Sequence, residues 1–61
     1  MKVREVIKRL EQEGWRHVRS VGSHRTFKKT GVASIVTVSG SDGKDVLIGQ
    51  LHDIKRKAGW K

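Results

Sequence analysis

Helix-type apolar spacing at both ends of the chain encloses a middle segment that has the composition of strands. The apolar residues near the N-terminus follow the i, i+3, i+4, i+7 spacing of an amphipathic helix: Val3, Val6, Ile7 and Leu10. A second set recurs at helical spacing near the C-terminus: Leu47, Ile48, Leu51, Ile54 and Ala58. We therefore expect helices at about residues 2–13 and 48–58, ended by Gly14 and Gly59.

Three short segments between these helices have the composition of β-strands. Residues 15–21 and 24–29 flank the dipeptide Gly22-Ser23, and residues 33–38 are β-branched along most of their length. Gly22-Ser23 and Thr30-Gly31 are typical turn sequences, so consecutive segments are expected to pair as an antiparallel meander.

The element order α-β-β-β-α predicts an α+β fold in which both helices pack on one face of a three-stranded antiparallel sheet. Trp15, Phe27 and Trp60 are the expected large side chains of its core. The 61 residues make one domain, residues 1–61, without cysteines for a disulfide or a thiolate metal site. Double-stranded-RNA-binding domains share this order, but their basic cluster begins the second helix. In this chain the basic cluster Lys55-Arg56-Lys57 lies at the end of the second helix. It is interpreted either as a C-terminal charge cluster that suits the helix dipole or as an RNA contact.

The distribution of charge says more about partners than its total. The chain has 14 Lys and Arg against 6 Asp and Glu, a net charge of +8, and positions 14–41 hold no acidic residue. Such an unscreened positive segment indicates nucleic acid as the partner. An anionic membrane fits less well, because no segment outside the core-forming helices pairs an apolar face with a basic one. Without a signal peptide or a long apolar run, a soluble cytoplasmic protein is expected.

His24 is the best candidate for chemistry, since it begins a strand after Gly22-Ser23 and lies among cations. Imidazole titrates near neutral pH and can move a proton beside a bound polyanion. The carboxylates show no metal-ligand spacing, and neither a phosphate-binding glycine loop nor a nucleophile elbow occurs. The tripeptide taken alone, however, favours a plain hairpin turn with His24 as an ordinary polar strand residue, and His17 is interpreted as a bystander.

The whole chain resembles the HicA-type (YcfA-like) mRNA interferase toxins in the order and spacing of its motifs. An N-terminal helix ends in Glu13-Gly14-Trp15, and Arg19, Gly22-Ser23-His24 and Phe27 follow. The similarity continues through four further motifs: Val36-Thr37-Val38, Gly43-Lys44-Asp45, Leu51 to Ile54, and Lys57-Ala58-Gly59. The resemblance implies a fold similar to the double-stranded-RNA-binding domain, metal-independent mRNA cleavage with His24 as the catalytic residue, and neutralisation by a HicB-type antitoxin.

Two departures from the family's pattern lie between the third strand segment and the second helix. Members often have a proline where this chain has Ser39 and a second histidine where it has Ser41, so any role of a second imidazole is absent. The turn before the second helix also lacks the usual proline and reads Leu47-Ile48-Gly49.

These observations give a specific hypothesis for the site. His24 removes the proton from a 2′-hydroxyl, which attacks the adjacent phosphate and leaves a cyclic phosphate end. Gly22, Ser23 and Lys28 are expected to position the substrate, and period-two counting puts Lys28 on the strand face of His24. The cations assigned to RNA binding are Arg16, Arg19, Arg25, Lys29 and Lys44.

Neither a metal nor a cofactor is expected. The expected partners are mRNA and the antitoxin, with the chain monomeric when free or assembled with antitoxin into a larger complex. The rival hypothesis is a non-catalytic RNA-binding module or translational regulator that uses the same cationic sheet. DNA binding ranks third, since no recognition-helix arrangement is visible.

Overall fold

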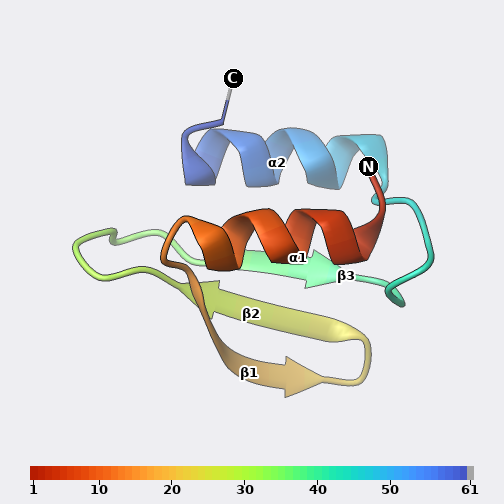
Figure 1. The fold of residues 1–61 in the computed structure, drawn as a ribbon, viewed down its shortest axis with the longest axis horizontal. Coiled ribbons are helices and arrows are strands. Elements are labelled where there is room, and N and C mark those ends of the chain that lie inside the picture. The colour runs from red at the N-terminus through yellow and green to blue at the C-terminus, as the bar shows by residue number, and fades with distance from the viewer. Residues whose placement is uncertain (61) are drawn as a thin grey trace.

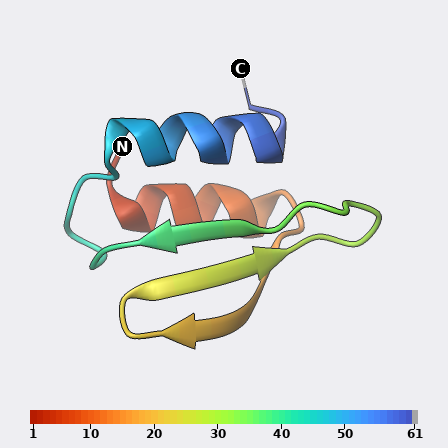
Figure 2. The same ribbon diagram turned by 180° about the vertical axis from the view of Figure 1, so that it is seen from behind.

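The computed structural model describes residues 1–60, and its elements follow the predicted order. They are α1 (Val3–Gln12), β1 (Arg16–Val21), β2 (His24–Lys28), β3 (Val36–Ser39) and α2 (Ile48–Ala58). Both helices lie on the same side of the sheet and contact β3, with α2 beside α1, as Figure 1 and the reverse view in Figure 2 show. The predicted α+β fold, with two helices on one face of a three-stranded antiparallel sheet, is confirmed.

The two helices form where the apolar spacing predicted them. α1 buries Val3, Val6 and Leu10 completely. α2 has the predicted limits, and Gly59 follows it with φ 76°, the left-handed conformation that glycine adopts most readily. Among residues 1–60, neither helix is long and apolar enough to span a membrane.

The first turn of α2 differs from its prediction as a core element. Leu47 and Ile48 are 78% and 75% exposed, whereas Ile54 is buried. Val46, in the preceding loop, enters the core instead. The helix therefore meets the core from Leu51 onward, and the apolar side chains of Leu47 and Ile48 are in solvent.

The sheet has the order β1-β2-β3, with both neighbouring pairs antiparallel. A β-bulge interrupts the β1–β2 register between His17 and Arg19. The third strand begins at Val36, not at the predicted residue 33. Because β2 ends at Lys28, one residue beyond the Phe27–Val36 pair, residues 33 and 34 have no β2 residue opposite them.

One face of the sheet builds the core. Phe27, Val36 and Val38 are at most 1% exposed and pack against both helices. The predicted anchors Trp15 and Trp60 are also buried. Every residue of β1 is exposed, so this strand extends beyond the cover of the helices as the free edge seen in Figure 1.

The loop between β3 and α2 is fastened to the start of α1. The first backbone N–H groups of a helix have no partner inside it. Here Val3 N–H donates to the carbonyl of Lys44 (2.8 Å) and Arg4 N–H to that of Asp42 (3.2 Å). Val46 N–H donates in return to the carbonyl of Met1 (2.9 Å). These bonds fix the loop in place although it contains neither helix nor strand.

At the other end of α1, Trp60 closes the core. The Trp60 indole N–H donates to the Glu13 carboxylate, and the Arg9 guanidinium lies 4.2 Å from the centre of the indole ring. A cation over an aromatic face stabilises the contact further. The segment after α2 is thereby tied to the last turn of α1.

Candidate active site

His24 owes its position to the turn that precedes it. Val21 and His24 face each other across β1 and β2, which leaves Gly22-Ser23 as a two-residue hairpin loop. Gly22 has φ 57°, the left-handed conformation that such tight loops require at their first position. The predicted hairpin turn is confirmed, and it exposes the His24 side chain at the end of the sheet.

A hydrogen bond ties the His24 ring to the neighbouring strand. His24 and Ser39 are paired across β2 and β3, and 2.8 Å separates His24 Nδ1 from Ser39 Oγ. The backbone N–H of Ser39 donates to the side-chain carbonyl of Gln50, on the first turn of α2, at 3.1 Å. Residues from β2, β3 and α2 thus hold the imidazole, and Nε2 is the ring nitrogen left for a bound molecule.

The register assigns several cations to the face that carries His24. Directly opposed residues of an antiparallel pair point to the same side of the sheet, and alternate residues along a strand do so too. His24 and Lys28 therefore share a face with Arg16, paired with Lys28, and with Arg19, paired with Thr26. Phe27, Val36 and Val38 occupy the opposite, helix-covered face. We call the uncovered side, with Arg16, Arg19, His24 and Lys28, the open face.

Distances along the strand divide the open face into two parts. At about 3.3 Å per residue, Lys28 lies about 13 Å from His24. Lys28 and its partner Arg16 thus lie at the end of β2 that is farther from the imidazole. Arg19, opposite Thr26, lies nearer to His24 along the strand.

Other sequence-predicted cations are not gathered around His24. Arg25 is on the covered face, and its guanidinium donates to the Asp42 carboxylate at 2.6 Å, which pins the loop to β2. Lys29 follows β2 and lies beside Gly14, where an added Cβ would be 3.7 Å from Lys29 Cε.

The second histidine of the sheet also faces away from the site. The His17 ring lies 5.4 Å from that of Phe27, on the covered side, and its Nε2 is hydrogen-bonded to Ser20 Oγ at 2.7 Å. The interpretation of His17 as a bystander therefore agrees with its position.

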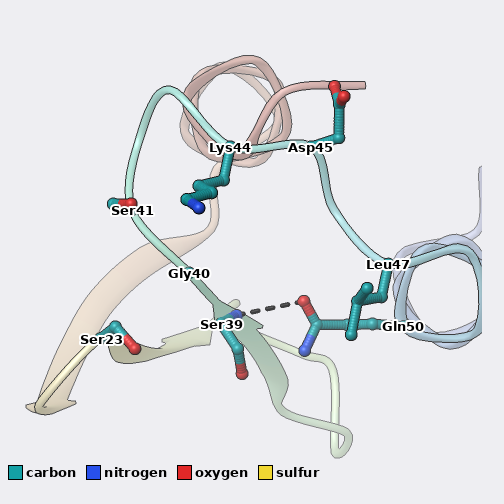
Figure 3. Close-up of a pocket in the computed structure, with 8 residues that line it drawn as sticks. All are labelled: Ser23, Ser39, Gly40, Ser41, Lys44, Asp45, Leu47 and Gln50. Atoms are coloured by element: carbon teal, nitrogen blue, oxygen red, sulfur yellow. Dashed lines mark hydrogen bonds between the residues drawn. The ribbon is translucent and has the colours of Figure 1, made fainter.

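A pocket of about 410 Å³ lies next to the His24 partner Ser39. This volume falls within the range of about 300 to 1,000 Å³ that is usual for small-molecule sites. Lys44 extends into the pocket from its loop, and the Gln50 amide reaches across it to Ser39 (Figure 3). The residues that line it are Ser23, Ser39, Gly40, Ser41, Lys44, Asp45, Leu47 and Gln50.

The remaining charged clusters lie elsewhere. Among residues 1–60, no three His, Asp or Glu side chains come together in a way that would hold a metal ion. In α2, hydrogen bonds from Lys57 and Arg56 lower the pKa of Asp53 below its ordinary value. Two cations of the basic triplet thus pair within the helix, which favours its interpretation as a C-terminal charge cluster.

Ser39 and Gln50 are the members of the site that sequence reasoning missed. Ser39 drew attention only as a departure from the family's pattern, and Gln50 drew none. The signal that would have found Ser39 is the β2–β3 register, since it puts Ser39 opposite His24. That register depends on the connection between Lys28 and Val36, whose length and path local patterns do not determine.

Comparison with known sequences gives a family match. No curated protein matches the sequence. The sequence model of a family described as the HicA toxin of bacterial toxin-antitoxin matches residues 3–60. This match spans every helix and strand of the structure and includes both His24 and Ser39. The chain therefore belongs to the HicA family of bacterial toxins, which act in toxin–antitoxin systems.

Proposed function

We propose that this toxin is a metal-independent endoribonuclease that cleaves mRNA with His24 as its general base. The observation that carries the proposal is the exposed His24 imidazole, which a 2.8 Å bond between Nδ1 and Ser39 Oγ orients on the same face as the strand cations Arg16, Arg19 and Lys28. RNA brings its own nucleophile to such a site, and DNA lacks it. The chemistry then needs only a positioned base and charges that bind phosphates.

The proposed reaction uses Nε2 of His24. This nitrogen takes the proton of a 2′-hydroxyl, and the 2′-oxygen forms a bond to the adjacent phosphorus. The bond from phosphorus to the 5′-oxygen breaks, and that oxygen takes a proton from water. The products are a 2′,3′-cyclic phosphate end and a 5′-hydroxyl end. One positioned base contributes about 10²- to 10⁴-fold to such a rate.

The cations divide the work of holding the substrate. Arg19 and Lys44 bind phosphates close to the reacting one, because both lie at the His24 half of the molecule. Arg16 and Lys28 bind a phosphate farther along the strand. Gly22 keeps the turn narrow, and Ser23 lines the pocket beside Ser39, where its hydroxyl positions the nucleotide.

Family membership implies an antitoxin partner, and we propose a HicB-type protein that covers the open face. The segment 14–41 has five cations and no acidic residue, so an acidic surface is complementary to it. Because RNA and antitoxin compete for the same charges in this proposal, neutralisation is steric and reversible.

The test is cleavage of a defined RNA by the purified toxin in excess EDTA, with the product ends identified by mass. We expect cleavage by the wild type and a loss of about 10²- to 10⁴-fold in His24→Ala. His52→Ala is the matched control, because His52 is an exposed histidine on α2. Intact RNA with the wild type, together with retained RNA binding, would instead indicate a non-catalytic RNA-binding module.

A further inference from the structure

We infer that Ser39 is the positioning residue of His24: its hydroxyl oxygen accepts a hydrogen bond from Nδ1–H, which keeps the proton on Nδ1 and makes Nε2 the basic nitrogen. The inference rests on the proposed function of His24 and adds a residue to it. It starts from the cross-strand pair in which Ser39 Oγ lies 2.8 Å from His24 Nδ1.

Ser39 is well suited to fix the ring because it is itself fixed. It is half-buried at the end of β3 and follows Val38, which is completely buried. Its backbone N–H donates to Gln50 Oε1 at 3.1 Å, which couples the strand end to the first turn of α2. The hydroxyl therefore meets His24 from a backbone that a second element holds in place.

The chemistry selects the direction of the hydrogen bond. Neutral imidazole carries its proton on one ring nitrogen only, and the hydrogen bond of one nitrogen decides which nitrogen that is. A serine hydroxyl is able to donate or to accept. If Ser39 donated to Nδ1, Nε2 would carry the proton and be unable to act as a base. If Ser39 accepts, Nε2 is free to take the proton of the substrate.

The accepting arrangement also survives the proton transfer. Once Nε2 is protonated, both ring nitrogens are donors, and Nδ1–H still donates to Ser39 Oγ. The same bond thus holds the neutral and the charged ring without rotation of the hydroxyl, as a preorganised site requires.

Ser39 makes one hydrogen bond to His24 and another to Gln50, and the two bonds use different groups of the residue. The first uses a side-chain hydroxyl, and the second uses a backbone N–H. A proline at position 39 supplies neither, because its ring nitrogen has no hydrogen. The link from α2 through β3 to the imidazole therefore requires a residue with a hydroxyl and a backbone N–H at this position.

The kinetic test compares Ser39→Ala with Ser39→Thr, which keeps a hydroxyl. The control is Ser34→Ala, an exposed serine in the connection before β3. We expect Ser39→Ala to lower kcat roughly 3- to 10-fold with KM unchanged, the effect of one lost hydrogen bond. Ser39→Thr is expected to restore most of kcat, and Ser34→Ala to match the wild type. An unchanged kcat in Ser39→Ala would overturn the inference.

The second readout is independent of cleavage and so separates this inference from the proposed function. Nitrogen-15 NMR of the imidazole, at a pH where His24 is titrated to its neutral form, reports which nitrogen has the proton. We expect Nδ1 in the wild type and a shift of the proton toward Nε2 in Ser39→Ala, with circular dichroism checking that the variant is folded. A proton on Nε2 in the wild type contradicts the inference even if the toxin cleaves RNA. The expected tautomers in a toxin that does not cleave contradict the proposed function alone.

Discussion

The two faces of the same three strands have opposite compositions. On the covered face, Phe27, Val36 and Val38 are buried among the helices, and the one strand cation there, Arg25, is paired with Asp42. The open face carries Arg16, Arg19, His24 and Lys28, and the segment 14–41, which contains all three strands, has no acidic residue to neutralise them.

Neighbouring residues on one strand therefore have different roles: one packs in the core, and the next carries charge on the open face. A small domain has little stability to lose, on the order of 0.05 to 0.15 kcal/mol per residue. Concentrating apolar burial on one face leaves the other free to hold charges that repel one another. Substitutions on the two faces should therefore separate cleanly into those that unfold the protein and those that disable it.

The largest effect is expected from the covered face. Phe27→Ala removes a ring that is 1% exposed and leaves a cavity, which costs about 3 to 5 kcal/mol of unfolding free energy. Urea unfolding followed by circular dichroism measures this loss. The neighbour Thr26→Ala, on the open face, is the control and should cost less than about 1 kcal/mol. Equal losses in the two variants would contradict the division between the faces.

A weaker effect, on binding and not on folding, is expected from the open face. The triple variant R16Q/R19Q/K28Q removes three proposed phosphate contacts. For single strands the slope of log K against log salt changes by about 0.7 per contact, so it should become shallower by about 2. Filter binding of a short RNA at several salt concentrations measures the slope, and an unchanged slope would mean that RNA binds elsewhere.

Arg25→Gln sharpens the comparison, because Arg25 was assigned to RNA binding from the sequence but lies on the covered face. Loss of its partly exposed ion pair with Asp42 should cost about 0 to 1 kcal/mol of stability. We expect the salt slope of RNA binding to stay at the wild-type value. If Arg25→Gln reduced the salt slope as much as Arg19→Gln does, Arg25 would have to be counted among the residues that contact RNA.

The smallest effect concerns the charged cluster near the C-terminal end of α2. Hydrogen bonds from Lys57 and Arg56 lower the pKa of Asp53 from its ordinary value of 3.8. A depressed folded-state pKa stabilises the protein above the unfolded pKa, and this contribution disappears as the pH falls through the folded value. The stability difference between the wild type and Asp53→Asn should therefore shrink in thermal melts below about pH 4. A difference that is constant with pH would show that the carboxylate charge has no role.

The fold was predictable from the sequence because its signals are local. The helical spacing ending at Leu10, the turn dipeptide Gly22-Ser23 and the glycine after α2 each determine the conformation of a few neighbouring residues. Two expectations that depend on longer-range contacts were wrong. β3 begins only where β2 offers a partner, and Leu47, which belongs to the apolar set of the second helix, is exposed.

The site was predictable only in part, for the same reason. His24 is set by its turn and was recognised through its motif. Its contact with Ser39 depends on the register across a long connection, and the separation of Arg25 from Arg19 depends on a bulge that shifts the alternation of β1. Local patterns contain neither the register nor the bulge, so the assignment of cations to a face needed the structure.

Because both tryptophans lie at one end of the molecule, intrinsic fluorescence reports on the environment of that end only. Trp15 and Trp60 are both buried at the C-terminal end of α1, whereas the loop that carries Lys44 is fastened to its N-terminal end. Ten helical residues, about 15 Å, separate these ends. Intrinsic fluorescence should consequently follow melting of the whole domain and stay unchanged when a mononucleotide, too short to reach Arg16 beside Trp15, binds at the His24 end. An emission change on adding the mononucleotide would show that its binding is transmitted along α1 to the indoles.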